Sequence, residues 1–542
     1  MVCGRAPAQV FTTLHSFTAL SVPNTGTNVD GRNPGISILS GNTLFGVASQ
    51  GGVGNAGTVY AVNTDGSGFT VVHNFTALSV IATGTNGDGG LPVNLILSGN
   101  TLYGATSSGG SGGNGTIFSV NTNGTGFTVL HSFTALSVPN TGTNADGAKP
   151  GFLQLAGANL YGTTSKGGSG GNGTIFSINT NGTGFTNLHV FAFGTNSFFG
   201  TITNADGSGP ASLMLSGNTL YGATRSGGSS ANGTVFAINT SGAGFTNLHI
   251  FTAGTNAYPN IGTNSDGALP SISVLSGTSL YGTTQYGGSG GNGTVFVINT
   301  SGGGFTNLHV FAFGTNSIYG FATNSDGAAP GGLLILSGNT LYGTTTSGGS
   351  SANGTVFAVN TSGTGFTNLH IFTAGTNAYP NIGTNSDGAL PTISPVSSNV
   401  LYGTTSKGGR GGNGTVFAIN PSGATFTNLH DFGPGSSVTN SDGMSPMIYS
   451  LSSNILYGIA SSGGYSANGT VFSLSSGAAV GTISVPIVVT RSGNKLVLTW
   501  TNASYLLQSA PLVTGTYTNI NGATSPFTNL ITGPLKFFRL VQ

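Results

Sequence analysis

Charged residues are scarce in this chain. Of its 542 residues, 4% are charged, against about 25% in a typical soluble domain. Glu is absent, which excludes a pair of glutamates for glycoside hydrolysis. The formal net charge of +1 creates no long-range field that would attract nucleic acid or an anionic membrane. A nearly neutral surface rich in Gly, Thr, Ser and Asn is also poorly protected against self-association.

Cysteine and long apolar runs are equally rare. The single cysteine is Cys3, so no internal disulfide can form. No apolar run approaches the roughly 18 residues that suggest a membrane-spanning helix. The first residues contain Ala6-Pro7-Ala8, which resembles the end of a secretory signal but lacks the apolar stretch that should precede it. We expect an extracellular or cell-surface (secreted) protein, from composition alone.

What the chain does contain is one unit repeated eight times. An element of the form F-T-x-L-H-x-F, which is F-T-V-V-H-N-F at Phe69, begins at Phe11, Phe69, Phe127, Phe185, Phe245, Phe305, Phe366 and Phe426. Its histidines are the only ones in the chain: His15, His73, His131, His189, His249, His309, His370 and His430. L-Y-G, which is L-F-G at Leu44, recurs at spacings of 58, 58, 60, 60, 61, 60 and 55 residues. Self-similarity at a fixed period is typical of repeat architectures.

Each unit has the pattern of four short strands. In the unit that starts at Pro391, the strands PTISPVS, VLYGTTS, TVFAIN and FTNLHDF are separated by turns or loops rich in Gly, Asn or Ser. Residues that are β-branched or aromatic alternate along them, and no segment has a helical period. Four strands per unit, repeated eight times, predict an all-β protein with an eight-bladed β-propeller; a solenoid is the alternative.

The two ends of the repeat region favour the propeller. The last unit ends at its third strand, near Leu474, without a following F-T-x-L-H-x-F, and an extra copy stands at Phe11 to Phe17. The N-terminal strand therefore completes the last blade by pairing with Thr470 to Ser475, which removes exposed sheet edges. The same strand could instead complete the last blade of a neighbouring chain.

The units resemble the GloVer-type (choice-of-anchor) tandem repeats of secreted bacterial proteins. The resemblance rests on the D-G-x-x-P, L-Y-G-T-T, G-G, G-T-V-F and F-T-x-L-H-x-F elements and covers roughly residues 11 to 475. It implies a secreted, repeat-built β-propeller with a variable C-terminal part that acts as an anchor. It implies no activity, substrate or catalytic residue.

Three segments follow from these boundaries. We expect an N-terminal tail over residues 1–10, the propeller over 11–476, and a C-terminal module over 477–542 that contains the only tryptophan, Trp500. Alternating strands in the last segment predict a small β-sandwich-like module. It carries four basic residues and no acid, whereas the propeller has a net charge of −4. The module is therefore expected to be an anchor or a link.

The repeated T-N-x-D-G element supplies eight of the ten acidic residues and is the candidate metal site. These are Asp30, Asp88, Asp146, Asp206, Asp266, Asp326, Asp387 and Asp442. Each precedes the first strand of a blade, so the eight carboxylates are expected to form a ring at one mouth of the central channel. A ring of carboxylates could bind Ca²⁺, but the earlier acid of a calcium loop is missing. The alternative is an Asx-type turn, in which Asp accepts backbone N–H groups.

The eight repeated histidines are more consistent with a structural role than with a catalytic one, because they occupy equivalent positions in all units. A His with an Asp could bind a metal, but eight identical positions favour a half-buried His that holds neighbouring blades together. The L-Y-G tyrosines are expected to pack between blades. No G-x-S-x-G or H-E-x-x-H motif occurs, and only Asp65 and Asp431 are acids outside the repeat. We therefore expect no catalytic residues, no enzyme and no required cofactor.

The connections between blades carry the candidate ligand-binding residues. Because strand direction alternates, the loops between blades and the Gly-rich loops between second and third strands emerge on the same face. The former contain Phe198, Phe199, Tyr258, Tyr319 and Tyr379. Aromatic side chains among amides suit sugars or protein surfaces, although they could also fold over and cap the blades.

The sequence therefore predicts an extracellular, non-catalytic structural or adhesive propeller. Its low charge and duplicated loops favour a homo-oligomer or a polymer, such as a fibre or surface layer. The alternative is a soluble propeller whose aromatic loops bind a glycan or a cell-surface protein.

Overall fold

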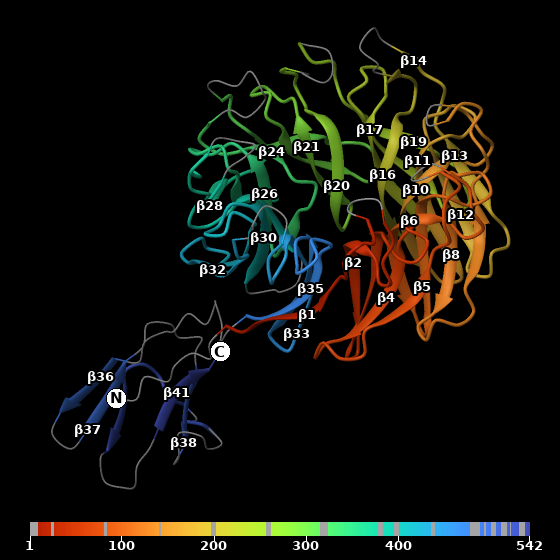
Figure 1. Ribbon diagram of the computed structural model, residues 1–542. Coiled ribbons are helices and arrows are strands. Elements are labelled where there is room, and N and C mark those ends of the chain that lie inside the picture. The colour runs from red at the N-terminus through yellow and green to blue at the C-terminus, as the bar shows by residue number, and fades with distance from the viewer. Residues whose placement is uncertain are drawn as a thin grey trace. The chain divides into compact units, whose positions relative to one another are not determined.

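The computed structural model is a chain of short β-strands (Figure 1). It describes residues 9–22, 26–80, 84–139, 142–196, 202–255, 262–314, 323–377, 383–394, 400–434, 439–476, 488–492, 495–499, 506–510, 518–520, 522–530 and 537–541. Within these ranges there is no helix, and so none long and apolar enough to cross a membrane. The chain divides into two compact units, residues 1–478 and 479–542.

The first unit is an eight-bladed propeller, as predicted, and each blade is an antiparallel sheet. Blade 1 contains β2 (Arg32–Ser40), β3 (Thr43–Gln50), β4 (Thr58–Asn63) and β5 (Thr70–Asn74). Blade 2 contains β6 (Gly90–Ser98), β7 (Thr101–Ser108), β8 (Thr116–Asn121) and β9 (Thr128–Ser132). Blade 3 contains β10 (Ala148–Ala156), β11 (Asn159–Lys166), β12 (Thr174–Asn179) and β13 (Thr186–Val190). Blade 4 contains β16 (Ser208–Ser216), β17 (Thr219–Ser226), β18 (Thr234–Asn239) and β19 (Thr246–Ile250).

The second half of the ring repeats this arrangement. Blade 5 contains β20 (Ala268–Ser276), β21 (Ser279–Tyr286), β22 (Thr294–Asn299) and β23 (Thr306–Val310). Blade 6 contains β24 (Ala328–Pro330), β25 (Ile335–Ser337), β26 (Thr340–Ser347), β27 (Thr355–Asn360) and β28 (Thr367–Ile371). Blade 7 contains β29 (Ala389–Ser394), β30 (Leu401–Lys407), β31 (Thr415–Ile419) and β32 (Phe426–Asp431). Blade 8 contains β33 (Met444–Ser452), β34 (Ile455–Ser462), β35 (Thr470–Ser475) and β1 (Phe11–Ser16).

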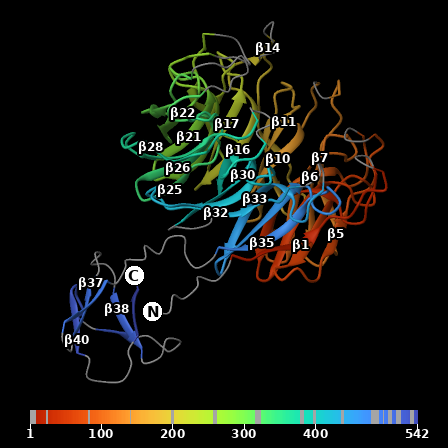
Figure 2. The same cartoon turned by 60° about the vertical axis from the view of Figure 1, so that its left-hand side comes forward.

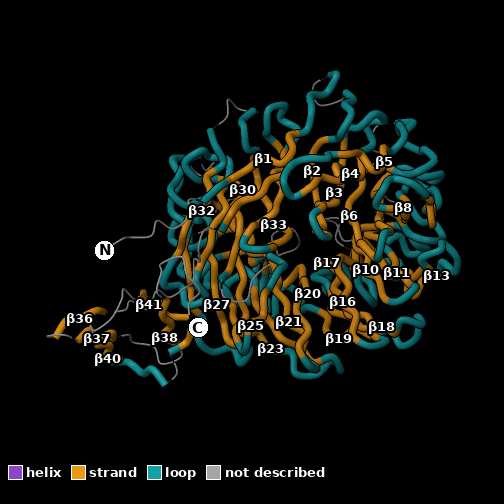
Figure 3. Tube along the Cα trace, turned by 90° about the horizontal axis from the view of Figure 1, so that it is seen from below, coloured by secondary structure: helices purple, strands orange, loops and turns teal. Residues whose placement is uncertain are grey.

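The blades surround a common centre (Figure 3). First strands of neighbouring blades contact one another, as β2 does β6 and β33, so the first strand of each blade is innermost and the fourth is outermost. The loop between blades 3 and 4 adds a short hairpin of β14 (Thr195–Asn196) and β15 (Ile202–Thr203).

The N-terminal strand closes the ring as predicted. Figures 1 and 2 show β1 beside β35, and the antiparallel register pairs Phe11 with Leu474 and Ser16 with Thr470. Hydrogen bonds extend the pairing beyond the strand: the N–H of Ser475 donates to the carbonyl of Val10 at 2.9 Å, and that of Phe17 to Gly469 at 3.1 Å. The last blade is thereby completed within the chain.

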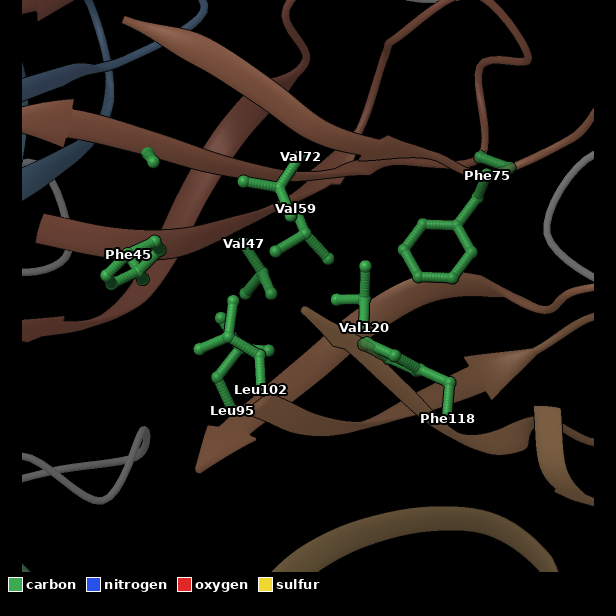
Figure 4. Packing of buried hydrophobic residues seen from close by; sticks show 11 residues of the cluster. Phe45, Val47, Val59, Val72, Phe75, Leu95, Leu102, Phe118 and Val120 are labelled. Carbon is green, nitrogen blue, oxygen red and sulfur yellow. The ribbon is translucent and has the colours of Figure 1, made fainter. Parts of the chain in front are cut away.

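The hydrophobic core consists of layers between successive blades. In the layer of Figure 4, Phe45, Val47 and Phe75 of blade 1 pack against Leu102 and Phe118 of blade 2. The L-Y-G tyrosines occupy equivalent places, since Tyr221 of blade 4 lies in one cluster with Ile272 and Phe296 of blade 5. The expectation that these tyrosines pack between blades is confirmed.

The glycine of L-Y-G is explained by the aromatic ring opposite it. A Cβ on Gly104 would lie 2.3 Å from the ring of Phe118 on the neighbouring strand. The third strand has an aromatic residue at this position in every blade, and the second strand has Gly. The pair fills the blade interior without a void, since overpacking there forces strain.

Blade 6 departs from the common pattern in its innermost strand. In each of seven blades the repeated Asp precedes the Leu of L-Y-G by 14 residues, but in blade 6 Asp326 precedes Leu341 by 15 residues. The extra residue interrupts the strand, so that β24 pairs with β26 through Pro330 and pairing resumes at Ile335. An inserted residue that breaks a strand ladder in this way is a bulge.

The second unit consists of two three-stranded sheets. One contains β36 (Val488–Ser492), β37 (Lys495–Thr499) and β40 (Phe527–Leu530); the other contains β38 (Leu506–Ala510), β39 (Thr518–Asn519) and β41 (Phe537–Val541). Leu498 of the first sheet and Leu507 of the second are buried in one cluster. The two sheets therefore share a core, as in a sandwich. Trp500 lies outside the described residues.

Candidate functional site

Each repeated histidine is paired with the repeated aspartate that follows it. In all eight pairs the Nε2 atom of His lies 2.8–3.0 Å from a carboxylate oxygen of Asp. The His belongs to the fourth strand of one blade, and the Asp to the loop that leads into the next. The side chains are mostly buried, with His15 17% and Asp30 3% exposed. The pair ties the outermost strand to the chain that crosses to the next blade.

Further donors surround the carboxylate. The backbone N–H of Thr76 donates to Asp88 at 3.1 Å, and the Thr76 hydroxyl donates to the other oxygen. Burial by itself would raise the pKa of Asp88, but the hydrogen bonds from His73 and Thr76 outweigh it and hold that pKa below its ordinary value. The pKa of Asp146 is lowered in the same way, by His131 and Thr134 against burial. These carboxylates are therefore stabilised in their charged form.

The turn itself is made by the neighbouring asparagine. The Asn86 side-chain oxygen accepts the N–H groups of Gly89 and Gly110, at 2.9 and 2.8 Å, and its amide donates to the carbonyls of Thr76 and Gly89. The sequence predicted that the Asp makes an Asx-type turn. In the structure the Asn makes this turn, and the Asp is paired with the His. The following Gly89 has a φ of +102°, which Gly adopts without steric cost.

Stacked rings connect each pair to the next blade. His15 of blade 8 lies against Phe69 of blade 1, with ring centroids 3.5 Å apart and planes at 7°. The same stack occurs at all eight blade junctions, with centroid distances of 3.5–3.9 Å. At the ring closure, Phe11 stacks on His430 of blade 7. The expectation of a half-buried His that holds blades together is confirmed.

The eight carboxylates do not gather into the ring expected at the channel mouth. Each is beside the outermost strand of the preceding blade, because the His of that strand and the residue after its motif supply its hydrogen-bond donors. Nowhere in the described ranges do three His, Cys, Asp or Glu side chains come together as a metal ion would require. The sequence identified the His and Asp by their recurrence, but it did not show that Phe, Thr and Asn of the same motifs complete the junction.

The predicted ligand-binding aromatics cannot be placed. Phe198, Phe199, Tyr258, Tyr319 and Tyr379 all lie outside the described residues. The face on which their loops emerge is nevertheless defined. The N–H of Asn264, in an inter-blade loop, donates to the carbonyl of Gly288, in a second-to-third-strand loop, at 3.2 Å. The two sets of loops therefore meet on one face, hereafter the loop face, as expected from the alternation of strand direction.

Exposed apolar side chains on this loop face were not recognised from the sequence. Of the ten large apolar side chains that are exposed in the described part of the chain, eight belong to these two sets of loops: Val22, Val29, Val53, Val80, Val138, Phe193, Phe313 and Tyr465. Phe193 and Phe313 are 77% and 75% exposed. The turns on the opposite face consist of Asn, Asp, Ser, Thr, Pro, Ala and Gly. Apolar residues in these turn-rich loops do not recur with a strand or helix period. Apart from their place in the loops, the sequence therefore gave no indication that these side chains are exposed.

Comparisons with solved structures find chains to which this one is similar at low sequence identity. One is the computationally designed Ika8 protein, at a TM-score of 0.43 and 12% identity, with 84% of this chain and 98% of that chain covered. Another is a puromycin-hydrolyzing peptidase from Mycobacterium tuberculosis, at a TM-score of 0.39 and 10% identity, with 82% and 61% covered. At these values neither similarity bears on function. A comparison with curated proteins gives no match.

One protein-family model matches the sequence. It describes the Gloeobacter/Verrucomicrobia repeat and matches residues 5–198, 77–269 and 312–490. These ranges contain most of the propeller and more than half of the chain. The chain belongs to the Gloeobacter/Verrucomicrobia repeat family.

Proposed function

We propose that this chain is an extracellular, non-catalytic propeller that adheres to further copies of itself through the loop face. The observation that carries the proposal is the concentration of exposed large apolar side chains on this one face. Large apolar side chains that are exposed on one face can contribute to an interaction surface. The propeller and its repeats provide a rigid scaffold for such a surface.

The use of the ionisable groups supports a non-catalytic role. Eight of the ten acids are held in the His–Asp pairs at the blade junctions. The remaining two, Asp65 and Asp431, accept hydrogen bonds from Ser67 and from the backbone of Arg410. Every acid thus has a local structural partner. Acid–base catalysis instead needs a group placed to exchange a proton with a substrate.

The choice of a second copy as the partner rests on charge and symmetry. With 4% charged residues and a net charge of +1, copies of the chain repel one another weakly. Equivalent loops repeat around the ring, so two loop faces can meet about a twofold axis in an isologous contact. The contact between two loop faces does not require the basic residues of the C-terminal module, because ion pairs at a protein surface typically contribute only about 0–1 kcal/mol.

Sedimentation velocity of the full chain over a range of concentrations tests the proposal. We expect the chain to self-associate, and the double variant Phe193→Ser, Phe313→Ser to do so at least tenfold more weakly. The matched control, Val10→Ser with Met447→Ser, removes exposed apolar side chains outside the loop face and should associate like the parent. Exposed substitutions of this kind change stability by only about 0.5 kcal/mol. If all three proteins stay monomeric at high concentration, the adhesive role through self-association is wrong.

A further inference from the structure

One strand position breaks the repetition in three consecutive blades. In each blade a proline of the first strand pairs with a residue of the second strand, as Pro210 pairs with Thr224 in blade 4. The position in question is the next residue of the second strand, which is Arg225 in that blade. Five blades carry serine there: Ser49, Ser107, Ser165, Ser406 and Ser461. Blades 4, 5 and 6 carry Arg225, Gln285 and Thr346 instead. Three adjacent exceptions among eight copies call for a local reason.

The serine has a structural role that two of the exceptions give up. The hydroxyl of Ser49 donates to the backbone carbonyl of Asn33 at 3.3 Å, and that of Ser107 to Leu91 at 3.2 Å. Thr346 keeps this bond, to Ala329 at 3.0 Å. Arg225 and Gln285 make no such bond to the first strand of their blades among the described hydrogen bonds. Their side chains are thus not needed to tie the two inner strands together.

All three exceptional residues line one cavity. It has a volume of about 240 Å³ and lies across the inner strands of blades 4, 5 and 6. Pro270 and Ser271 of β20 contribute to its wall, and Pro330 to Gly332 of blade 6 complete it. The residues at the exceptional positions in three blades therefore converge on a single place.

The bulge in blade 6 shapes this cavity. Gly331 and Gly332 stand at the point where the extra residue separates β24 from β25. The bulge is anchored to blade 5, because the hydroxyl of Thr283 donates to the carbonyl of Gly331 at 3.1 Å and the N–H of Leu334 donates to the hydroxyl of Ser273 at 2.9 Å. Bulges are enriched beside functional sites, where they redirect the chain. The wall of the cavity is thus formed before any ligand arrives.

The lining has the chemistry of an anion site. The exposed guanidinium of Arg225 is its only charged group, and no carboxylate lines it. The described contacts give Arg225 no ion pair, and they leave the hydroxyl of Ser271 and the amide of Gln285 available as donors. A guanidinium can bind a carboxylate through two parallel hydrogen bonds. Pro270 and Pro330, which are largely buried, contribute apolar atoms to the wall of the cavity, which suits the face of a ring.

We propose that this cavity binds a small hydroxylated carboxylate, the chemistry of a sugar acid. Arg225 holds the carboxylate, Gln285 and Ser271 bond the hydroxyl groups, and the proline side chains contact the ring. The ligand is either a free sugar acid or a residue of an acidic polysaccharide. This site is independent of the proposed self-association, since it lies within one ring and includes none of the exposed loop residues.

Isothermal titration calorimetry of the full chain with free galacturonate and with polygalacturonate tests the assignment. We expect galacturonate to bind, neutral galactose to bind at least tenfold more weakly, and inorganic phosphate not to compete at equal concentration. If the polymer binds tighter per residue than the monomer, the natural source is a polysaccharide; equal affinity indicates the free acid. If phosphate competes as well as galacturonate, the site takes any anion and the sugar-acid assignment is wrong.

Three variants locate the binding. Arg225→Ser installs the residue of the other blades and should weaken galacturonate binding at least tenfold. Deletion of Gly332 restores the usual strand length and should abolish binding. Ser107→Arg places an arginine at the same position of a blade without the bulge, and it should add no second site. Unchanged thermal unfolding of Arg225→Ser secures the fold, and unchanged affinity in that variant overturns the proposal, whatever the oligomeric state of the protein.

Discussion

Closure of the ring by β1 can be tested by the substitution Phe17→Ala. Phe17 directly follows β1 and is 0% exposed. It packs in one cluster with Leu14 and Val471 of blade 8 and with Tyr60 of blade 1. Its ring meets that of Tyr60 edge to face, with centroids 5.3 Å apart at 72°. The side chain therefore joins the first blade to the last.

The expected loss follows from burial. Truncation of a fully buried Phe to Ala costs about 3–5 kcal/mol, since it removes apolar contacts and leaves a cavity. If β1 detaches from β35 by local opening, the loss raises the population of the open state by roughly 140- to 3,700-fold, at about 1.4 kcal/mol per factor of ten. Detachment leaves the other seven blades intact, because none of them includes a strand from elsewhere in the chain.

Hydrogen exchange measured by mass spectrometry reports this opening. Amides of β1 and of its partner β35 should exchange faster in Phe17→Ala by the factor given above. The matched control is Phe191→Ala, at the equivalent position after β13, also 0% exposed, where the strand is continuous with its own blade. It should lose comparable stability without faster exchange in β1. Equal exchange of β1 in both variants, or no acceleration in Phe17→Ala, would refute closure by this strand.

Three further substitutions test the blade junctions. The folded pKa of Asp88 is below its ordinary value near 3.8, so the contribution of this carboxylate to stability is present above that value and is lost as pH falls through the folded pKa. The variant Asp88→Asn should therefore be less stable than the parent at pH 7. Its urea midpoint should also fall less than that of the parent between about pH 5 and 2. The Tyr60 hydroxyl is buried without a hydrogen-bond partner in the described chain, so Tyr60→Phe should raise stability by about 1–3 kcal/mol, and a lower melting temperature would contradict this. One oxygen of Asp442 is likewise buried and unpartnered beside Gly433, where a Cβ would lie 3.4 Å from it; Gly433→Thr supplies the hydroxyl found in other blades and should stabilise by about 1–3 kcal/mol, as calorimetry can check.

The fold was predictable because its signals are local and repeated. Alternation in strands such as TVFAIN, together with the position of the extra copy at Phe11, determined the strand count and the closure. Recurrence also identified His73 and Asp88 as partners of some kind. Their geometry depends on a chain crossing between blades, and for that reason the pairing of Asp with the outermost strand and the stacking of Phe127 on His73 were visible only in three dimensions.

The cavity illustrates the opposite case. Arg225, Gln285 and Thr346 are about 60 residues apart along the chain, and each by itself is an ordinary substitution in a solvent-facing strand position. The inserted residue near Gly332 changes one spacing by a single position. Only the ring places these departures side by side, because neighbouring blades present the same strand position to one centre.

The displaced strand β1 also sets an order of events during synthesis. Phe11 leaves the ribosome before blades 1 to 7, and its partner Leu474 leaves only after them. At about 5–20 residues per second, the nascent chain keeps β1 without its partner for tens of seconds. Blades 1 to 7 can form as they emerge, since each is continuous. The apolar side of blade 1 that later packs against blade 8 stays uncovered throughout this time. Exchange of β1 between copies is therefore most favoured among nascent chains that are held close together on one messenger RNA.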